Sequence, residues 1–294
     1  MHADQLTDPI VDHGEGPVFS SRWAGPRWVD LLAGDILELG PDGGTARHHV
    51  GTVAAVIRPR RGGGHVIAGE RGLLLADDDA LDAPVRALPE VWAGTEVRSE
   101  GVRNEGVRMN EGGCDPAGNL YLGSMPYDGR EGGGNLYRFG PDLTPEIAVP
   151  EVTISNGLEW SPDDALAYYV DTRTGRIDVF DWDAEGGLRN RRPFVEIDGE
   201  GGPDGLTVDA EGGVWVALYG GWAVRRYTPQ GRLDAVIEVP ARQVTAVTFA
   251  GPDLDRLIIT TSRHGLAEDD VGPAGALFGA SPGIRGRPVR EFAG

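Results

Sequence analysis

Four segments of the sequence repeat one layout, in which a turn built from Pro or Ala with Asp and Gly precedes a short run rich in Val, Ile, Trp and Tyr. One turn residue in each segment marks the register, and these residues lie 46, 48 and 42 positions apart: Pro116, Pro162, Ala210 and Pro252. A period of roughly 40 to 50 residues is typical of the four-stranded blades of a β-propeller. Two weaker units begin near Pro26 and Arg58, so the sequence predicts six blades.

Glycine and proline content agrees with this prediction. The chain has 46 Gly and 21 Pro among 294 residues, which favours many short strands and tight turns over long helices. Apolar residues make up 40% of the chain, enough to bury a substantial core. A β-sandwich, or a pair of them, is the alternative that the same strands would build, but sandwiches do not require this repeat. We therefore expect an all-β, six-bladed propeller with a central channel, formed as a single domain over residues 1–294.

The charge of the chain bears on its partners. Acidic residues number 46 against 27 basic ones, for a net charge of −19, and this charge would repel a phosphate backbone or an anionic membrane surface. Nucleic acid and membranes are therefore not expected as partners. Every basic residue is Arg, and the absence of Lys excludes Schiff-base chemistry.

Cellular location is predicted from two further features. Cys114 is the only cysteine and cannot form an internal disulfide, and it is expected to be a buried small hydrophobe. The first 17 residues are acidic and lack the apolar run of a signal peptide, and no stretch approaches the length of a membrane helix. We expect a soluble, cytoplasmic protein that is monomeric by default.

One position of the repeat carries polar side chains. Six residues before the register marks the sequence has, in order, Asn110, Asn156, Asp204 and Ala246. Equivalent positions on the innermost strands of a propeller surround its channel, so these side chains should converge. Asn-Gly and Asp-Gly pairs are also common in turns, and that interpretation remains open for Asn156 and Asp204.

A second acidic candidate precedes the first unit, where Glu15 lies between two glycines in the stretch HGEGP. With Asn156 and Asp204 it forms a set of oxygen donors. Such a set suits one divalent cation, Ca²⁺ first, with Mg²⁺ or Mn²⁺ as alternatives, whereas Zn²⁺ is possible but more often recruits His or Cys.

With these residues identified, the sequence resembles the six-bladed propellers of the gluconolactonase, regucalcin and senescence-marker-protein family from about Val11 to Phe292. The resemblance rests on six stretches that agree in order and spacing: GEGPVF at Gly14, PRWVDLLAGDI at Pro26, RMNEGGCDPAGNLYLGSM at Arg108, ISNGLEWSPDDALAYYVDT at Ile154, GGPDGLTVDAEGGVWVALYGG at Gly201 and AGALFGASPGIRGRPV at Ala274.

The resemblance implies a role for each matching residue. It implies one divalent metal bound by Glu15, Asn156 and Asp204, and substrate contacts from Arg108, Asn110 and Asp128. Two features depart from the family pattern and leave the substrate open. Glu111 stands where the family commonly has Asp, and Arg263 and His264 lie in a stretch without a clear counterpart.

The reaction that the resemblance implies is hydrolysis of a small lactone, with a sugar lactone such as an aldonolactone as the first expectation, and other esters or phosphoesters remain open as substrates. The metal would polarise the lactone carbonyl, and Asp204 would be both ligand and catalytic base for the attacking water. Two alternatives remain: a propeller that binds a divalent metal or another ligand without catalysis, and a scaffold that binds proteins through its loops.

Other motifs are weaker. Residues 279–283 read GASPG and match the nucleophile elbow formally, but no His follows Ser281. Asp181, Asp183 and Glu185 resemble the start of a calcium loop, but Arg192 occupies the position that requires Glu. Of the histidines, His13 and His264 are the best candidates for a functional role because they flank candidate site segments.

Overall fold

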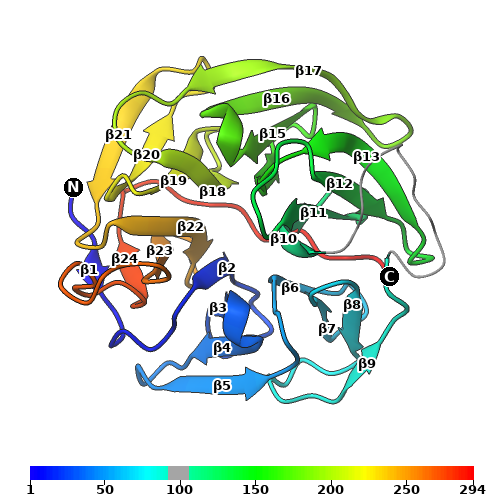
Figure 1. Ribbon diagram of the computed structural model, residues 1–294, viewed down its shortest axis with the longest axis horizontal. Helices are drawn as coiled ribbons and strands as arrows, with labels where there is room; N and C mark the ends of the chain where they lie inside the picture. The colour runs from blue at the N-terminus through cyan, green and yellow to red at the C-terminus, as the bar shows by residue number, and fades with distance from the viewer. Residues whose placement is uncertain (92–105) are drawn as a thin grey trace.

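Antiparallel strands arranged around a central axis make up the protein (Figure 1). The computed structural model describes residues 1–91 and 106–294. Within these ranges the helices are two single 3-10 turns, η1 (Leu31–Ala33) and η2 (Thr172–Thr174), and neither could cross a membrane. The all-β propeller architecture predicted from the repeat is confirmed.

Four separate sheets contain four strands each. The first consists of β2 (Gly14–Val18), β3 (Arg27–Asp30), β4 (Asp35–Leu39) and β5 (Thr45–His49). The second consists of β6 (Val56–Pro59), β7 (His65–Ala68), β8 (Leu73–Ala76) and β9 (Val85–Ala87). The third consists of β10 (Val107–Cys114), β11 (Leu120–Pro126), β12 (Gly134–Phe139) and β13 (Pro145–Val152). The fourth consists of β14 (Ser155–Trp160), β15 (Leu166–Asp171), β16 (Arg176–Asp183) and β17 (Gly187–Glu196).

The remaining eight strands form two further four-stranded units that share one residue pair, Tyr219 with Gln243. One unit contains β18 (Gly202–Val208), β19 (Val214–Tyr219), β20 (Ala223–Tyr227) and β21 (Leu233–Glu238). The other contains β22 (Gln243–Ala250), β23 (Arg256–Ser262), β24 (Phe278–Ala280) and β1 (Asp4–Gln5). The described residues thus form four four-stranded sheets and one eight-stranded sheet that divides into two such units, and the count of six blades stays a prediction.

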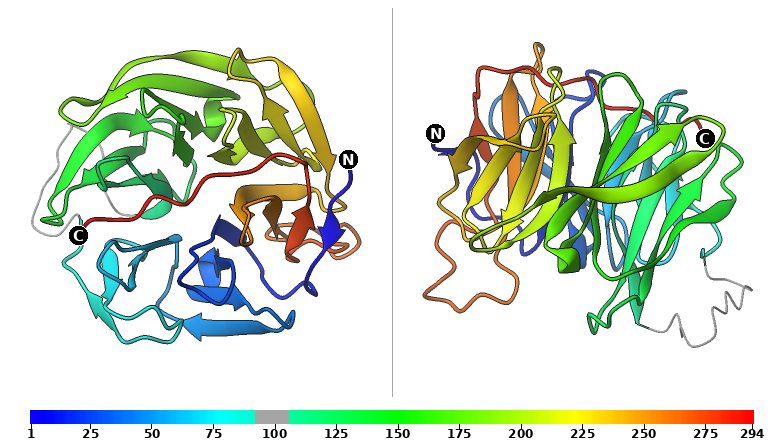
Figure 2. Two further views of the ribbon diagram at one scale, coloured as in Figure 1. Left: turned by 180° about the vertical axis from the view of Figure 1, so that it is seen from behind. Right: turned by 90° about the horizontal axis from the view of Figure 1, so that it is seen from above.

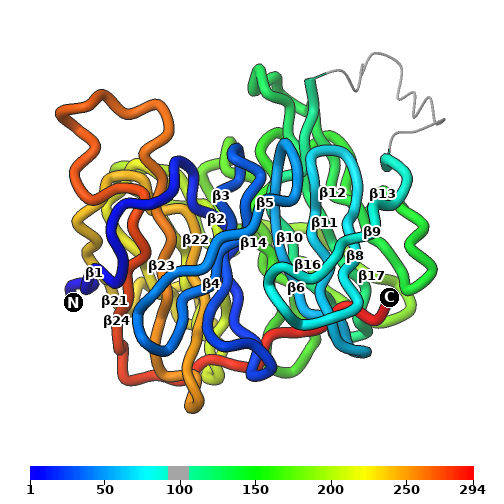
Figure 3. Tube along the Cα trace, turned by 90° about the horizontal axis from the view of Figure 1, so that it is seen from below, coloured from blue at the N-terminus to red at the C-terminus, as the bar shows by residue number. Residues whose placement is uncertain are grey.

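Both ends of the chain pack against the ring, at places far from each other (Figure 1). β1 pairs with β24, so the outermost strand of the last unit comes from the beginning of the chain. After β24 the chain crosses one face of the ring (Figures 2 and 3), and Phe292 is fully buried where it bridges to Arg60 in the second unit. The segment 263–277 projects from the opposite face. The two faces of the ring are therefore built differently.

Large apolar side chains pack between neighbouring units. Trp28, Trp160 and Trp215 are at most 1% exposed, and Trp160 and Trp215 belong to two different core clusters. Cys114 is buried in the core, as predicted, and burial raises the pKa of its thiol to about 12. A thiol in this environment stays protonated, which agrees with a packing role.

Candidate functional site

The innermost strands are irregular where the repeat carries its polar residues. The pairing register shifts once within β10, β14 and β18, and the interruptions contain Asn110, Asn156 and Asp204 respectively. In β2 the register shifts just after Glu15. A bulge leaves residues out of the ladder and re-aims their side chains. The bulges explain how Asn110, Asn156 and Asp204 turn toward the channel, whereas Glu15 still pairs with Val29 and lies at the edge of its bulge.

Glycines after two of these residues permit the strands to approach closely. A Cβ added to Gly157 would lie 2.9 Å from the carbonyl oxygen of Asp204, and one added to Gly205 would lie 2.8 Å from the Cα of Ala246. Any larger residue would push neighbouring units apart. The Asn-Gly and Asp-Gly pairs therefore lie inside strands and are not the connecting turns that the alternative interpretation required.

The three predicted metal ligands line one pocket of about 520 Å³. Glu15, Asn156 and Asp204 are 6%, 4% and 3% exposed. The pocket is completed by a polar group and an apolar group of side chains: His13, Arg108, Asn110, Thr172, Tyr219 and His264, and Leu32, Met125, Tyr127 and Ile154. The structure thus gathers Glu15, Asn156 and Asp204 with Arg108 and Asn110 in a single cavity.

Two carboxylate oxygens in this pocket lack partners. Glu15 Oε2 and Asp204 Oδ1 are buried, and neither accepts a hydrogen bond from the residues that the structure describes. Buried polar atoms are almost always paired, so an unpaired one requires an explanation. A cation bound between the two carboxylates would satisfy both atoms, and this donor set therefore fits a hard divalent ion.

The charges of the pocket also favour a bound divalent cation. Burial, followed by the nearby carboxylates of Asp204 and Glu111, raises the pKa of Glu15 well above its ordinary value. Burial and Glu111 likewise raise the pKa of Asp204. Two buried carboxylates in one cavity repel each other and lose hydration, and a divalent cation would offset both costs.

Asn156 is held in place from both sides. Its Oδ1 accepts a hydrogen bond from Asn110 Nδ2 at 3.2 Å, and its own Nδ2 donates to Thr172 Oγ1 at 2.8 Å. Asn110 Nδ2 also donates to the carbonyl of Ser155 at 2.8 Å. These bonds determine the orientation of the Asn156 amide, with its oxygen toward Asn110. An amide oxygen has two lone pairs, so Asn156 Oδ1 can accept the bond from Asn110 and still bind a cation.

Arg108 places a fixed positive charge in the wall of the pocket. Its Nη1 donates to the carbonyl of Met109 at 3.0 Å and to Asn110 Oδ1 at 2.6 Å. The guanidinium carbon lies 5.8 Å from the centre of the Tyr127 ring. Burial lowers the pKa of Arg108, but an Arg side chain stays charged in proteins. The side chain is therefore oriented to donate hydrogen bonds to a ligand.

Asp128, the third predicted substrate contact, does not line this pocket. Its side chain is 62% exposed and pairs with the guanidinium of Arg130 at 3.0 Å. The backbone N–H of Arg130, followed by its guanidinium, lowers the pKa of Asp128. A substrate contact from Asp128 stays a prediction. Glu111 also points elsewhere: it lines a small cavity of about 40 Å³ together with the C-terminal residues Val289 and Arg290.

Thr172 and Leu32 also line the pocket, and no sequence pattern described above points to them. Thr172 directly follows Asp171, and Leu32 lies two positions after Asp30. Each Asp accepts backbone hydrogen bonds from the segment before an inner strand: Asp171 from Thr153 and Ile154, and Asp30 from Asp12 and His13. Each Asp begins a 3-10 turn that ends at a left-handed glycine, Gly34 or Gly175. The shared pattern of Asp, three residues and Gly is the signal that would have located them.

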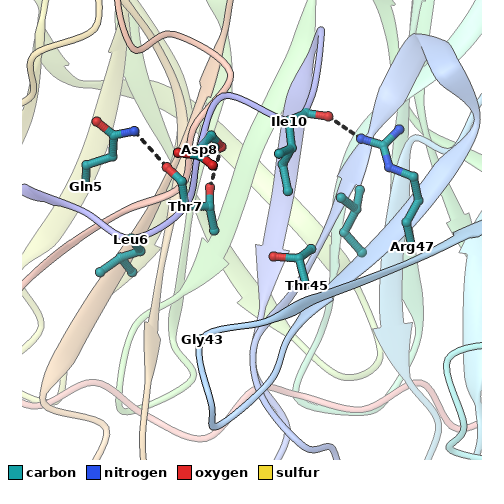
Figure 4. A pocket seen from close by; sticks show the side chains of 9 residues that line it. Gln5, Leu6, Thr7, Asp8, Ile10, Gly43, Thr45 and Arg47 are labelled. Carbon is teal, nitrogen blue, oxygen red and sulfur yellow. Dashed lines mark hydrogen bonds between the residues drawn. The ribbon is translucent and has the colours of Figure 1, made fainter.

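A larger pocket of about 740 Å³ lies outside the ring, between residues 5–10 and the strands β4 and β5 (Figure 4). Its polar groups are already engaged: Gln5 bonds to Thr7, and Arg47 bonds to the carbonyl of Ile10 and to Asp35. None of its residues has a buried unpaired polar atom among those described. Size alone therefore does not make it the functional site.

Within residues 1–91 and 106–294, no group of three or more His, Cys, Asp or Glu side chains is arranged to hold a metal. The predicted ligands Glu15, Asn156 and Asp204 fall outside that definition, because they are two carboxylates and one amide.

Residues 13–263 match the family model described as SMP-30/Gluconolactonase/LRE-like region. The chain is 31% identical to regucalcin of Danio rerio, covering 96% of this chain and 95% of that protein. It is also 31% identical to a pentonolactonase of Haloferax volcanii, covering 98% and 97%.

A solved structure gives the same result in three dimensions. The crystal structure of a calcium-binding protein, regucalcin, from Agrobacterium tumefaciens superposes with a TM-score of 0.89 at 28% identity, covering 99% of this chain and 97% of that one. Sequence and architecture therefore agree along nearly the whole chain, and the protein belongs to the SMP-30, gluconolactonase and LRE-like family.

Proposed function

We propose that this protein is a metal-dependent hydrolase that opens a small lactone, with a sugar lactone as the substrate class. The observation that carries the proposal is the pair of unpaired, buried carboxylate oxygens, Glu15 Oε2 and Asp204 Oδ1, in one pocket with Asn156. These three side chains would hold a divalent ion, and Ca²⁺ suits their oxygen atoms best.

A bound divalent ion supplies a Lewis acid that polarises the lactone carbonyl. The remaining work belongs to the side chains. Asp204 provides a carboxylate oxygen with no other hydrogen-bond partner among the described residues, and it can accept the proton that the attacking water loses.

Water is the only co-substrate of this hydrolysis. The oxygen of water bonds to the carbonyl carbon, the ring C–O bond breaks, and the proton taken up by Asp204 passes to the ring oxygen. The product is a hydroxy acid, which ionises at neutral pH and releases one proton. That released proton provides a direct measure of turnover.

Arg108 and Asn110 would position the substrate. Both line the pocket and are oriented by the hydrogen bond between them. Arg108 would donate from its guanidinium to a ring hydroxyl or to the ester oxygen, and Asn110, whose two N–H groups are already donated, would accept from a hydroxyl through its Oδ1. Leu32, Met125 and Ile154 form an apolar side of the same pocket. A sugar lactone has both hydroxyl groups and C–H faces and matches these two sides.

The names of relatives support a lactone as substrate. Besides the pentonolactonase, a protein of Pseudomonas putida that is 30% identical over 96% of this chain is named 6-deoxy-6-sulfogluconolactonase. The substrates in these names differ from one another, so they support the class of lactones and not one member.

The test is proton release from a panel of aldonolactones at pH 7.5, measured with chelator, after removal of the chelator, and after addition of Ca²⁺, Mg²⁺, Mn²⁺ or Zn²⁺. We expect hydrolysis that stops with the chelator and returns with a metal. Activity that is unaffected by the chelator, at the rate of untreated protein, would refute the metal-dependent mechanism.

A second function, binding of a divalent metal without catalysis, is favoured by the description of the Agrobacterium neighbour as a calcium-binding protein. The same experiment separates the two. A binding protein would show a higher unfolding temperature with metal but no hydrolysis of any lactone above the spontaneous rate.

A further inference from the structure

His13 and Ser262 meet where the first and last units of the ring adjoin. His13 comes directly before β2, Ser262 is the last residue of β23, and the two form an isolated antiparallel bridge. Their side chains also bond, with 2.7 Å between His13 Nδ1 and Ser262 Oγ. His13 is 8% exposed and Ser262 is fully buried, so the contact is shielded from water.

The partners of Ser262 determine which ring nitrogen of His13 carries the proton. Ser262 Oγ accepts a hydrogen bond from the backbone N–H of His264 at 3.1 Å. Its own proton has two acceptors within reach, the carbonyl of Asp12 at 3.4 Å and His13 Nδ1 at 2.7 Å, and the much shorter distance favours His13 Nδ1. A hydroxyl has one proton to donate. With Nδ1 as acceptor, a neutral imidazole carries its proton on Nε2.

The Nε2 side of the ring faces a predicted metal ligand. His13 Nε2 lies 3.7 Å from Glu15 Oε1, and both side chains are at least nine-tenths buried. At this distance the contact is electrostatic and not a hydrogen bond. An N–H on this side of the ring attracts the carboxylate, whereas a nitrogen lone pair in its place would repel it. The other oxygen of Glu15, Oε2, is the unpaired one. His13 thus contacts one oxygen while the other remains for the pocket.

We propose that His13 is a positioning residue, which Ser262 holds so that its Nε2–H orients the Glu15 carboxylate toward the metal. The inference rests on the proposed function, because it takes Glu15 as a ligand. The series of contacts from Ser262 through His13 to Glu15 runs from β23 to β2. The junction between the first and last units is therefore expected to affect the metal affinity of the site. Residues that orient a ligand from behind commonly change metal affinity 10- to 100-fold when removed.

The test compares three substitutions that differ in where they place a donor. Gln places its amide nitrogen near the position of Nε2, Asn places it near Nδ1, and Leu has no donor. We expect His13→Gln to bind Ca²⁺ within about threefold of the wild type, and His13→Asn and His13→Leu to bind it about 10- to 100-fold more weakly. Calorimetric titration with Ca²⁺ alone gives the dissociation constants.

Two further variants complete the experiment. Ser262→Ala removes the anchor of His13 without touching Glu15 and should also weaken Ca²⁺ binding. His49→Gln changes a histidine that is exposed and paired with Asp35, and it should bind Ca²⁺ as the wild type does. Thermal unfolding in chelator shows that each variant is folded before its affinity is compared.

Glu15→Gln separates the two proposals. If Glu15→Gln binds Ca²⁺ as tightly as the wild type, the metal site itself is wrong and the role of His13 falls with it. If Glu15→Gln binds weakly while His13→Leu and His13→Asn bind normally, the metal site stands and the positioning role is overturned. Equal weakening by the Gln and Leu variants of His13 would also overturn it, because the effect would then not depend on the donor.

Discussion

Asn110 Nδ2 donates a hydrogen bond to Asn156 Oδ1 at 3.2 Å, which joins equivalent positions of two neighbouring units at the channel. The bond links a predicted substrate contact to a predicted metal ligand. Substrate binding and metal binding are therefore expected to respond to the same substitution.

Asn110→Ala should lower kcat/KM for the best lactone by about tenfold or more and should also weaken Ca²⁺ binding, because the Asn156 amide loses one of its two anchors. Both quantities are measured on the same preparation. Asn135→Ala is the control, since Asn135 lies on β12 outside the pocket and bonds to Tyr137. A loss of activity with unchanged affinity for Ca²⁺ would mean that the bond between the two amides does not orient Asn156.

Asp204→Asn should have opposite effects on stability with and without metal. In chelator it should raise the unfolding temperature, because it removes one of two buried carboxylates that repel each other, and each kcal/mol gained corresponds to roughly 2 to 4 °C. With Ca²⁺ at about 100 times its dissociation constant, the wild type should gain about 2.7 kcal/mol and the variant much less.

Thermal unfolding at pH 8 with chelator or Ca²⁺ measures both effects of Asp204→Asn, and Asp128→Asn serves as the exposed control. A variant that is destabilised in chelator would show that the carboxylate is satisfied within the protein and needs no cation.

Arg58 and Glu111 form a buried ion pair beside the pocket. Arg58 Nη2 lies 3.4 Å from Glu111 Oε1, and both side chains are at most 10% exposed. Arg58→Met leaves the carboxylate without its partner and should cost about 3 to 5 kcal/mol of unfolding free energy. Adding Glu111→Leu should recover much of that loss, because no buried charge then remains unpaired.

Denaturant unfolding of the two single variants and the double variant gives the coupling energy between Arg58 and Glu111. Additive losses would show that the residues stabilise the protein independently.

His65 should make the protein less stable in mild acid. Both of its ring nitrogens are buried without partners among the described residues, and burial, followed by the charge of Arg27, lowers its pKa from 6.5 to about 4. Between these values the unfolded chain binds a proton that the folded protein does not. The stability that His65 contributes is therefore complete above pH 6.5 and falls by about 3 kcal/mol as the pH drops to 4.

Measuring the unfolding free energy from pH 7.5 to 4 tests the role of His65. His65→Leu should show a smaller decline than the wild type, whereas His2→Gln, which changes an exposed histidine, should show the same decline. If His65→Leu and the wild type decline in parallel, the buried imidazole is not the source of the acid sensitivity.

Much of the architecture could be predicted from local features of the sequence. Turn residues near every 45 positions and short β-rich runs encode one unit at a time, and strand and turn preferences act over few residues. The same register located Asn110, Asn156 and Asp204, because equivalent positions of a repeat occupy equivalent bulges.

Contacts between distant segments were decided only by the closed ring. His13 meets Ser262 across 249 positions of the chain, β1 completes the sheet that β22 begins, and Glu111 turns toward Arg58 although its neighbour Asn110 lines the pocket. A pattern in sequence specifies which residues share a strand and a repeat position. Which side chains meet across a seam depends on how every unit packs against the next, and that follows only from the folded chain as a whole.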